Sequence, residues 1–195
     1  MTAAPIPETV PMPLTQLDSH AALIVVDLQK GIVAMPTVHP SADIVERSAS
    51  LARAFRAAGH PVVLVNVDAG APGRTDAGPR NLPDDPEFAA FVPELERAPS
   101  DHVVTKKRWG AFLTTDLDTW LRAKGVEQVV IVGIATSIGV ESTARFASEH
   151  GYHVVLVTDA MTDFDIGVHE NSVTKIFPRL AETTTTADVL AKLRG

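Results

Sequence analysis

The chain has 195 residues, of which 45% are hydrophobic and 21% are charged, a composition that fits one globular domain with a sizeable core. Its 24 acidic residues outnumber its 17 basic ones and give a net charge of −7, which argues against nucleic acid as a partner because phosphate binding needs a basic face. The absence of cysteine excludes disulfides, thiolate metal ligands and a cysteine nucleophile.

The first 19 residues are rich in proline and precede the first apolar run. They lack the basic start and the continuous apolar stretch of a signal peptide, and every later apolar run is far shorter than a membrane span. We therefore expect a loosely ordered tail over residues 1–19, a single α/β domain over 20–195, and a cytoplasmic protein that does not contact a membrane.

Five short runs rich in valine and isoleucine are predicted to be β-strands. They are almost continuously hydrophobic rather than alternating, which is typical of parallel strands covered by helices on both faces. In chain order the strands are 21–27, 61–67, 102–105, 128–134 and 153–159. Segments with helical periodicity are 41–60, 115–125, about 138–150, about 169–180 and the C-terminal ADVLAKLR. The recurring order of helix, glycine and strand predicts an α/β sheet with right-handed crossovers.

Residues 68–100 interrupt this pattern with a stretch that is dense in proline, glycine and aspartate. A loop of this length inside a compact domain is either a lid or binding loop, or a surface excursion. The sequence leaves both interpretations open.

Polar side chains follow three separate strands at the points where these strands end. Asp27 ends the first strand, Lys106 follows the third, and the turn 136–139 follows the fourth. Ligands of parallel α/β sheets gather at the carboxyl ends of the strands. A carboxylate and an ammonium in one pocket can share general acid–base chemistry. The alternative is that Asp27 caps a turn and Lys106 is a solvated surface residue.

Ser137 offers a second possible chemistry. Residues 135–139, ATSIG, differ by one substitution from the G-x-S-x-G nucleophile elbow, and acidic residues and His169 follow in the order that a serine hydrolase requires. The oxyanion-loop signature HGGG is absent, however, and the chain is short for that fold. The competing interpretation is that Thr136 and Ser137 only satisfy free N–H groups at a helix start. The scattered histidines indicate no metal site, and we expect no cofactor.

Three motifs in order then carry a family resemblance: a strand ending in DLQ, TK-x-x-WGAF-x-x-T-x-L, and G-I-x-T-x-x-G-V-x-x-T-A-R. They resemble the isochorismatase-like hydrolase superfamily, and the similarity runs from about residue 20 to the C-terminus. The resemblance implies a three-layer, Rossmann-like α/β fold with a parallel sheet of about six strands flanked by helices. It also implies a small-molecule substrate and a homo-oligomer, dimeric or larger.

The family's usual site is an Asp, a Lys and a Cys. The resemblance places the Asp at Asp27 and the Lys at Lys106, with Lys107 as the other register. It also implies a cis peptide bond, which does not involve proline, between Ile134 and Ala135. The position of the Cys is occupied by Gly139, so this chain lacks the nucleophile of the thioester route that the amidases of the family follow.

Some members, including true isochorismatases, lack the Cys and hydrolyse a vinyl ether, and by this resemblance vinyl-ether hydrolysis is one reaction open to this chain. Asp27 would protonate the enol carbon, Lys106 would set its pKa, water would attack the oxocarbenium, and Gly139 would leave room for the substrate. The residues expected to line the pocket are Gln29, Trp109, Phe112, Ile134, Ala135 and Ser137. The alternatives are a metabolite-binding or structural member without catalysis, and a serine hydrolase that uses Ser137.

Overall fold

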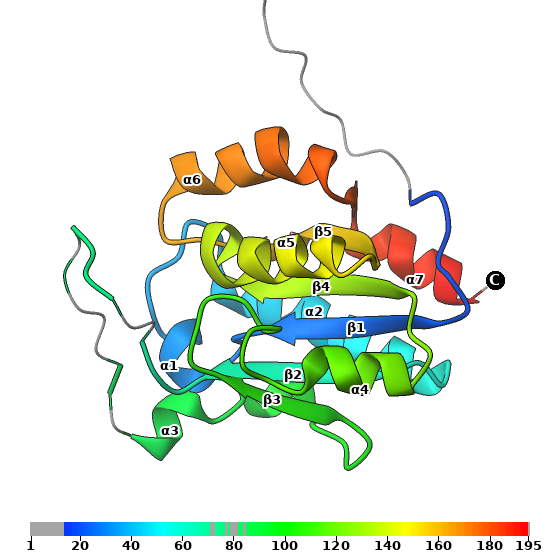
Figure 1. The fold of residues 1–195 in the computed structure, drawn as a ribbon, viewed down its shortest axis with the longest axis horizontal. Helices are drawn as coiled ribbons and strands as arrows, with labels where there is room; N and C mark the ends of the chain where they lie inside the picture. The colour runs from blue at the N-terminus through cyan, green and yellow to red at the C-terminus, as the bar shows by residue number, and fades with distance from the viewer. Residues whose placement is uncertain (1–13, 71–72, 77, 79–81, 84, 195) are drawn as a thin grey trace, which may run out of the picture.

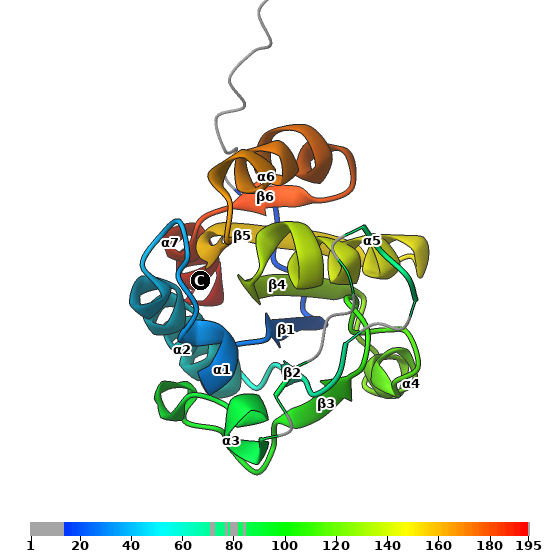
Figure 2. The ribbon, with the colours of Figure 1, turned by 90° about the vertical axis from the view of Figure 1, so that its left-hand side faces the viewer.

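The computed structural model describes residues 14–70, 73–76, 78, 82–83 and 85–194. At its centre is a six-stranded sheet in the order β3-β2-β1-β4-β5-β6, and every pair of neighbouring strands is parallel (Figure 1; β6 is labelled in Figure 2). The strands are β1 (Ala21–Val26), β2 (Val62–Val67), β3 (His102–Lys106), β4 (Gln128–Ile134), β5 (His153–Thr162) and β6 (Glu182–Thr184). The predicted α/β class with a parallel sheet of about six strands is confirmed.

Helices cover both faces of the sheet, as Figure 2 shows. On one face lie α2 (Ser41–Ala57) and α7 (Thr186–Arg194), and on the other lie α4 (Leu117–Ala123) and α5 (Glu141–Glu149). All six residues of β1 are buried between these layers, which explains why its sequence is apolar throughout rather than alternating. The predicted three layers are therefore present.

Several elements differ from the predicted ones. The strand β6 and the short helices α1 (Lys30–Val33) and α3 (Pro86–Ala89) have no counterpart among the predicted elements. The helix predicted to begin at 169 begins earlier, as α6 (Ile166–Asn171), because the Asp165 side chain accepts hydrogen bonds from the N–H groups of Gly167 and Val168 and caps it. Turns of π-helix and 3-10 helix then continue this segment to Arg179.

The N-terminal segment is packed from Leu14 onward. Leu14 is buried in the core, and Thr15 donates hydrogen bonds to the carboxylate of Glu182 from its backbone N–H and its hydroxyl. Asp18 donates its backbone N–H to the side-chain oxygen of Gln128. Residues 14–19 of the predicted tail therefore contact the domain, while residues 1–13 lie outside the described part of the chain.

The strand order creates a crevice at the carboxyl ends of β1 and β4. From β1 the chain moves outward to β2 and β3, and it then returns to the other side of β1 to form β4, β5 and β6. Loops that leave β1 and β4 therefore diverge at this switch point, which is where ligands bind in open α/β sheets. None of the helices in the described residues is long and apolar enough to cross a membrane.

Candidate active site

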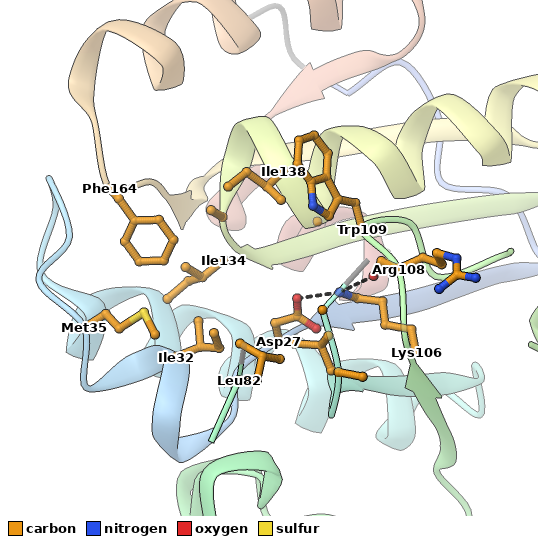
Figure 3. Close-up of a pocket in the computed structure, with 15 residues that line it drawn as sticks. Asp27, Ile32, Met35, Leu82, Lys106, Arg108, Trp109, Ile134, Ile138 and Phe164 are labelled. Atoms are coloured by element: carbon orange, nitrogen blue, oxygen red, sulfur yellow. Dashed lines mark hydrogen bonds and ion pairs between the residues drawn. The ribbon is translucent and has the colours of Figure 1, made fainter. Parts of the chain in front are cut away.

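A buried ion pair lies at the switch point. Asp27 directly follows β1 with its backbone in the left-handed region, at φ +53°, and Lys106 is the last residue of β3. The Lys106 Nζ donates to Asp27 Oδ2 at 2.7 Å and to the backbone carbonyl of Arg108 at 3.2 Å (Figure 3). Both side chains are buried, whereas Lys107 is exposed. Lys106 is therefore the lysine that faces Asp27.

Burial changes the acidity of Asp27. Desolvation raises the pKa of its carboxyl from 3.8 to about 6, although the charge of Lys106 and its hydrogen bond act in the opposite direction. A larger share of Asp27 is therefore protonated near neutral pH than of an exposed aspartate. The second carboxyl oxygen, Oδ1, is buried and has no hydrogen-bond partner within the described chain. The group can therefore give or take a proton near neutral pH.

The chain after β4 approaches Asp27 closely because of Gly133. Gly133 has φ +124°, and a Cβ atom at this position would collide with the backbone carbonyl of Val26. Only glycine lets the end of β4 lie against the end of β1 in this way. The peptide bond between Ile134 and Ala135 is cis, as the resemblance implied.

Gly139 lies in the π-helical turn Thr136–Val140, which precedes α5. Its φ is outside the left-handed region, so the backbone would accept a side chain here. A Cβ atom, however, would lie 3.1 Å from Asp27 Oδ2 and 3.0 Å from Val26 Cγ1, tighter than ordinary van der Waals contact. The absence of a side chain at Gly139 therefore gives Asp27 space on this side.

Buried polar contacts fix the turn in place. The Thr143 hydroxyl donates to the Gly139 carbonyl at 2.7 Å and accepts the Ala111 N–H at 3.1 Å, so it joins the WGAF segment to the turn. On the other side, the Thr136 hydroxyl is 2.9 Å from His169 Nδ1. Burial and the neighbouring His39 lower the pKa of His169. These contacts give the threonines of the third motif a role in positioning.

A cavity of about 70 Å³ opens beside Asp27 and Lys106. Ile32 and Met35 come from α1 and the residues after it, and Phe164 follows β5 (Figure 3). Ile134 is the last residue of β4, and Ile138 comes from the turn after it. The remaining lining residues are Val67, Ala69, Gly70, Leu82, Arg108, Trp109, Ala135 and Gly139. Because Ala69, Gly70 and Leu82 belong to the 68–100 stretch, that stretch forms part of the cavity wall.

Most of the predicted site residues lie together. Those that border the cavity are Asp27, Lys106, Gly139, Trp109, Ile134 and Ala135, while Gln29, Phe112 and Ser137 lie outside its lining. The Gln29 amide instead joins two elements, because it donates to the carbonyls of Val67 and Phe88 and accepts the Val67 N–H. Phe112 is buried on the α4–α5 side of the sheet, where it packs against His150 and Tyr152.

The surroundings of Ser137 do not resemble a nucleophile elbow. Its backbone N–H donates to the carboxylate of Asp163 at 2.7 Å, while the histidine of the predicted triad, His169, is hydrogen-bonded to Thr136 instead. A serine nucleophile needs a base within hydrogen-bond reach of its hydroxyl. In the described residues, no group of three histidine or acidic side chains is placed to hold a metal ion.

The apolar wall of the cavity was not predicted. Ile32, Met35, Leu82, Ile138 and Phe164 have the composition of core residues, and the search at the strand ends considered only polar side chains. One signal was present for Phe164, because it lies between two aspartates just after β5, at the same edge of the sheet as Asp27. Nothing comparable marked the other four.

Comparisons with known proteins identify the family of this chain. The sequence profile of the isochorismatase domain matches residues 21–188. The isochorismatase family protein YwoC of Bacillus subtilis is 41% identical over 183 residues, which cover 89% of this chain and 94% of the relative. Ureidoacrylate amidohydrolase RutB of Variovorax paradoxus is 33% identical over a region that covers 82% of this chain and 77% of the relative. A solved structure of an isochorismatase family protein from Burkholderia thailandensis is 44% identical with a TM-score of 0.89, and 92% and 98% of the two chains are covered.

Proposed function

Because this chain belongs to the isochorismatase family of hydrolases, we propose that it hydrolyses a small metabolite by acid–base chemistry at Asp27 and Lys106. The observation that carries the proposal is the buried Asp27, whose pKa is raised to about 6 beside a cavity that Gly139 also lines. The family resemblance assigns the cysteine position to Gly139. Water is then the nucleophile. Asp27 supplies and recovers the proton.

The reaction that fits this arrangement is vinyl-ether hydrolysis. Protonated Asp27 transfers its proton to the terminal carbon of the C=C–O group, and the ether oxygen and the adjacent carbon become an oxocarbenium ion. Water adds to that carbon and returns a proton to the Asp27 carboxylate. The resulting hemiacetal or hemiketal collapses to an alcohol and a carbonyl compound. One water molecule is consumed, and Asp27 ends in its starting state.

Lys106 supports the acid in two ways. Its ammonium holds Asp27 Oδ2 through a 2.7 Å hydrogen bond, which fixes the direction of the carboxyl group and leaves Oδ1 without a partner in the described residues. Its positive charge also keeps the pKa of Asp27 lower than burial alone would set it. The acid is therefore strong enough to protonate carbon and still partly protonated near neutral pH.

Amide hydrolysis, which the name of RutB states for that relative, fits this chain less well. The thioester route needs a thiolate, and this sequence contains no cysteine. The serine alternative lacks support as well, because the hydroxyl that His169 contacts is that of Thr136. Acid catalysis by Asp27 needs no residue that the chain lacks.

The proposal is tested by measuring turnover of isochorismate and of phenyl vinyl ether by the wild type and by Asp27→Asn. We expect the substitution to lower kcat/KM by about 100-fold or more, since a general acid contributes a factor of this order. Asp43→Asn, an exposed substitution in the first turn of α2, is the matched control. Equal activity of wild type and Asp27→Asn would exclude Asp27 as the acid. Ligand-induced stabilisation without turnover of any substrate would favour the non-catalytic alternative.

We also propose that the chain assembles as a homo-oligomer, dimeric or larger. The support is a group of exposed apolar side chains beside the site: Trp109 is 50% exposed, Leu113 is 45% exposed and Phe146 is 37% exposed. The Phe146 ring lies close to Gly110, the residue that follows Trp109, and Leu113 comes three residues after Gly110 in the chain. Exposed apolar clusters of this kind mark association surfaces. The mass of the protein in solution, measured by sedimentation, tests this.

A further inference from the structure

The cavity beside Asp27 has one polar end and one apolar end. Asp27 and Lys106 form the polar end, and the side chains of Ile32, Met35, Leu82, Ile134 and Phe164 surround the space away from Lys106 (Figure 3). A substrate whose reacting carbon lies at Asp27 must place the rest of its structure against this apolar end. The chemistry of the apolar end therefore selects the body of the substrate.

The charged side chains that line the cavity already have hydrogen-bond partners within the protein. Lys106 neutralises Asp27, and a second of its three N–H donors is bonded to the Arg108 carbonyl. The Arg108 guanidinium points away from Asp27 and from the apolar end (Figure 3), and it donates to the backbone carbonyl of the exposed Lys107 at 3.1 Å. Among the described residues, Lys106 and Arg108 are the only cationic residues that line the cavity, and neither side chain points to the apolar end in Figure 3.

We infer that the substrate presents an uncharged, apolar body to this site, in contrast to isochorismate, which carries two carboxylates. The inference rests on the proposed function, because it takes Asp27 as the point of reaction. A carboxylate at the apolar end would lose its hydration without gaining a cation from the described residues, and such a charge is buried only at a large cost. A carboxylate placed near Asp27 would also repel the anion that Asp27 becomes when it gives up its proton.

Binding of a matched pair of ethers tests the inference without requiring turnover. Ethoxybenzene and 4-ethoxybenzoate have the same shape as a phenyl vinyl ether but contain no reactive double bond, and they differ by one carboxylate. By calorimetry with the wild-type protein at pH 7.5, we expect ethoxybenzene to bind at least 10-fold more tightly. Equal or tighter binding of 4-ethoxybenzoate would overturn the inference, as would binding of neither.

A pair of variants at the apolar end provides a second test. Phe164 is only partly buried, so Phe164→Lys can place an ammonium at the apolar end, and Phe164→Leu keeps it apolar. We expect Phe164→Lys to bind 4-ethoxybenzoate at least 10-fold more tightly than the wild type does, and Phe164→Leu to keep the preference for ethoxybenzene. If Phe164→Lys does not fold, as judged by circular dichroism, the wild-type comparison alone decides.

These experiments distinguish failure of the proposed reaction from failure of the inference on substrate class. If ethoxybenzene binds but phenyl vinyl ether releases no acetaldehyde, the proposed reaction fails and the assignment of an uncharged ligand stands. If phenyl vinyl ether and 4-(vinyloxy)benzoate are hydrolysed with equal kcat/KM, the reaction stands and the inference on substrate class is wrong.

Discussion

At the scale of single residues, the account depends on how Lys106 sets the acidity of Asp27. Burial raises the pKa of Asp27, while the charge and hydrogen bond of Lys106 lower it. Lys106→Met removes the opposing contribution, so the pKa of Asp27 should rise above about 6. We expect the pH at which kcat/KM is half-maximal to move upward in Lys106→Met and to stay in place in Lys107→Met, whose side chain is exposed. An unchanged midpoint in Lys106→Met would show that the pair is not coupled.

Gly139 gives a second prediction at this scale. In Gly139→Ala the added methyl group would lie 3.1 Å from Asp27 Oδ2 and 3.0 Å from Val26 Cγ1. The backbone tolerates alanine, so we expect a folded protein destabilised by about 1–3 kcal/mol through crowding, with kcat/KM clearly reduced because the Asp27 carboxyl must move. Urea unfolding and steady-state kinetics measure the two effects. Full activity in Gly139→Ala would mean that the space beside Asp27 is not used.

The same scale shows which site residues a sequence can reveal. Asp27 and Lys106 were found because polar side chains at strand ends stand out from the apolar strands before them, whereas Gly139 was singled out by the family resemblance. Gln29 and Phe112 belong to the same motifs, but their side chains make other contacts. Gln29 donates to carbonyls of β2 and α3, and Phe112 packs against Tyr152. A motif identifies a segment, and the direction of each side chain within that segment depends on the tertiary structure.

At the scale of elements, the turn Thr136–Val140 depends on its buried contact with α6. His169 is held against Thr136, and burial and His39 lower the pKa of His169 below its ordinary value of 6.5. The unfolded chain therefore binds this proton more readily than the folded one, so the stability that neutral His169 contributes is present above pH 6.5 and is lost as the pH falls below it.

The variant His169→Leu tests whether neutral His169 stabilises the fold in this pH-dependent way. It loses the Thr136 contact and the titrating group together, so it should be destabilised at pH 8 by about 1 kcal/mol or more, and by less at pH 5.5. Urea unfolding of both proteins at the two pH values gives the difference. A destabilisation that is equal at pH 8 and pH 5.5 would mean that His169 does not titrate in a buried environment.

Elements were predictable to the degree that they are long and apolar. Five strands and the two-sided helical cover follow from the valine-rich runs and the glycines that end the helices. The strand β6 has only three residues, Glu182–Thr184, and its glutamate and threonines give no apolar run. The helices α1 and α3 have four residues each, too few for a helical period to show.

At the scale of the whole molecule, the strand order explains why the site lies where it does. Asp27 leaves β1, the turn leaves β4, and these neighbouring strands lead in opposite directions across the sheet. The sequence could predict this meeting point from the polar strand ends. The apolar wall could not be predicted, because α1, the stretch containing Leu82 and the residue after β5 become neighbours only in the folded chain.

The pH dependence of kcat/KM for phenyl vinyl ether, corrected for the uncatalysed reaction, tests the central claim most directly. Only protonated Asp27 can act as the acid, and burial raises its pKa to about 6. Activity should therefore increase as the pH falls through about 6 and become constant below it. Activity that instead decreases as the pH falls through the same range would show that Asp27 acts as a base, and would contradict the account.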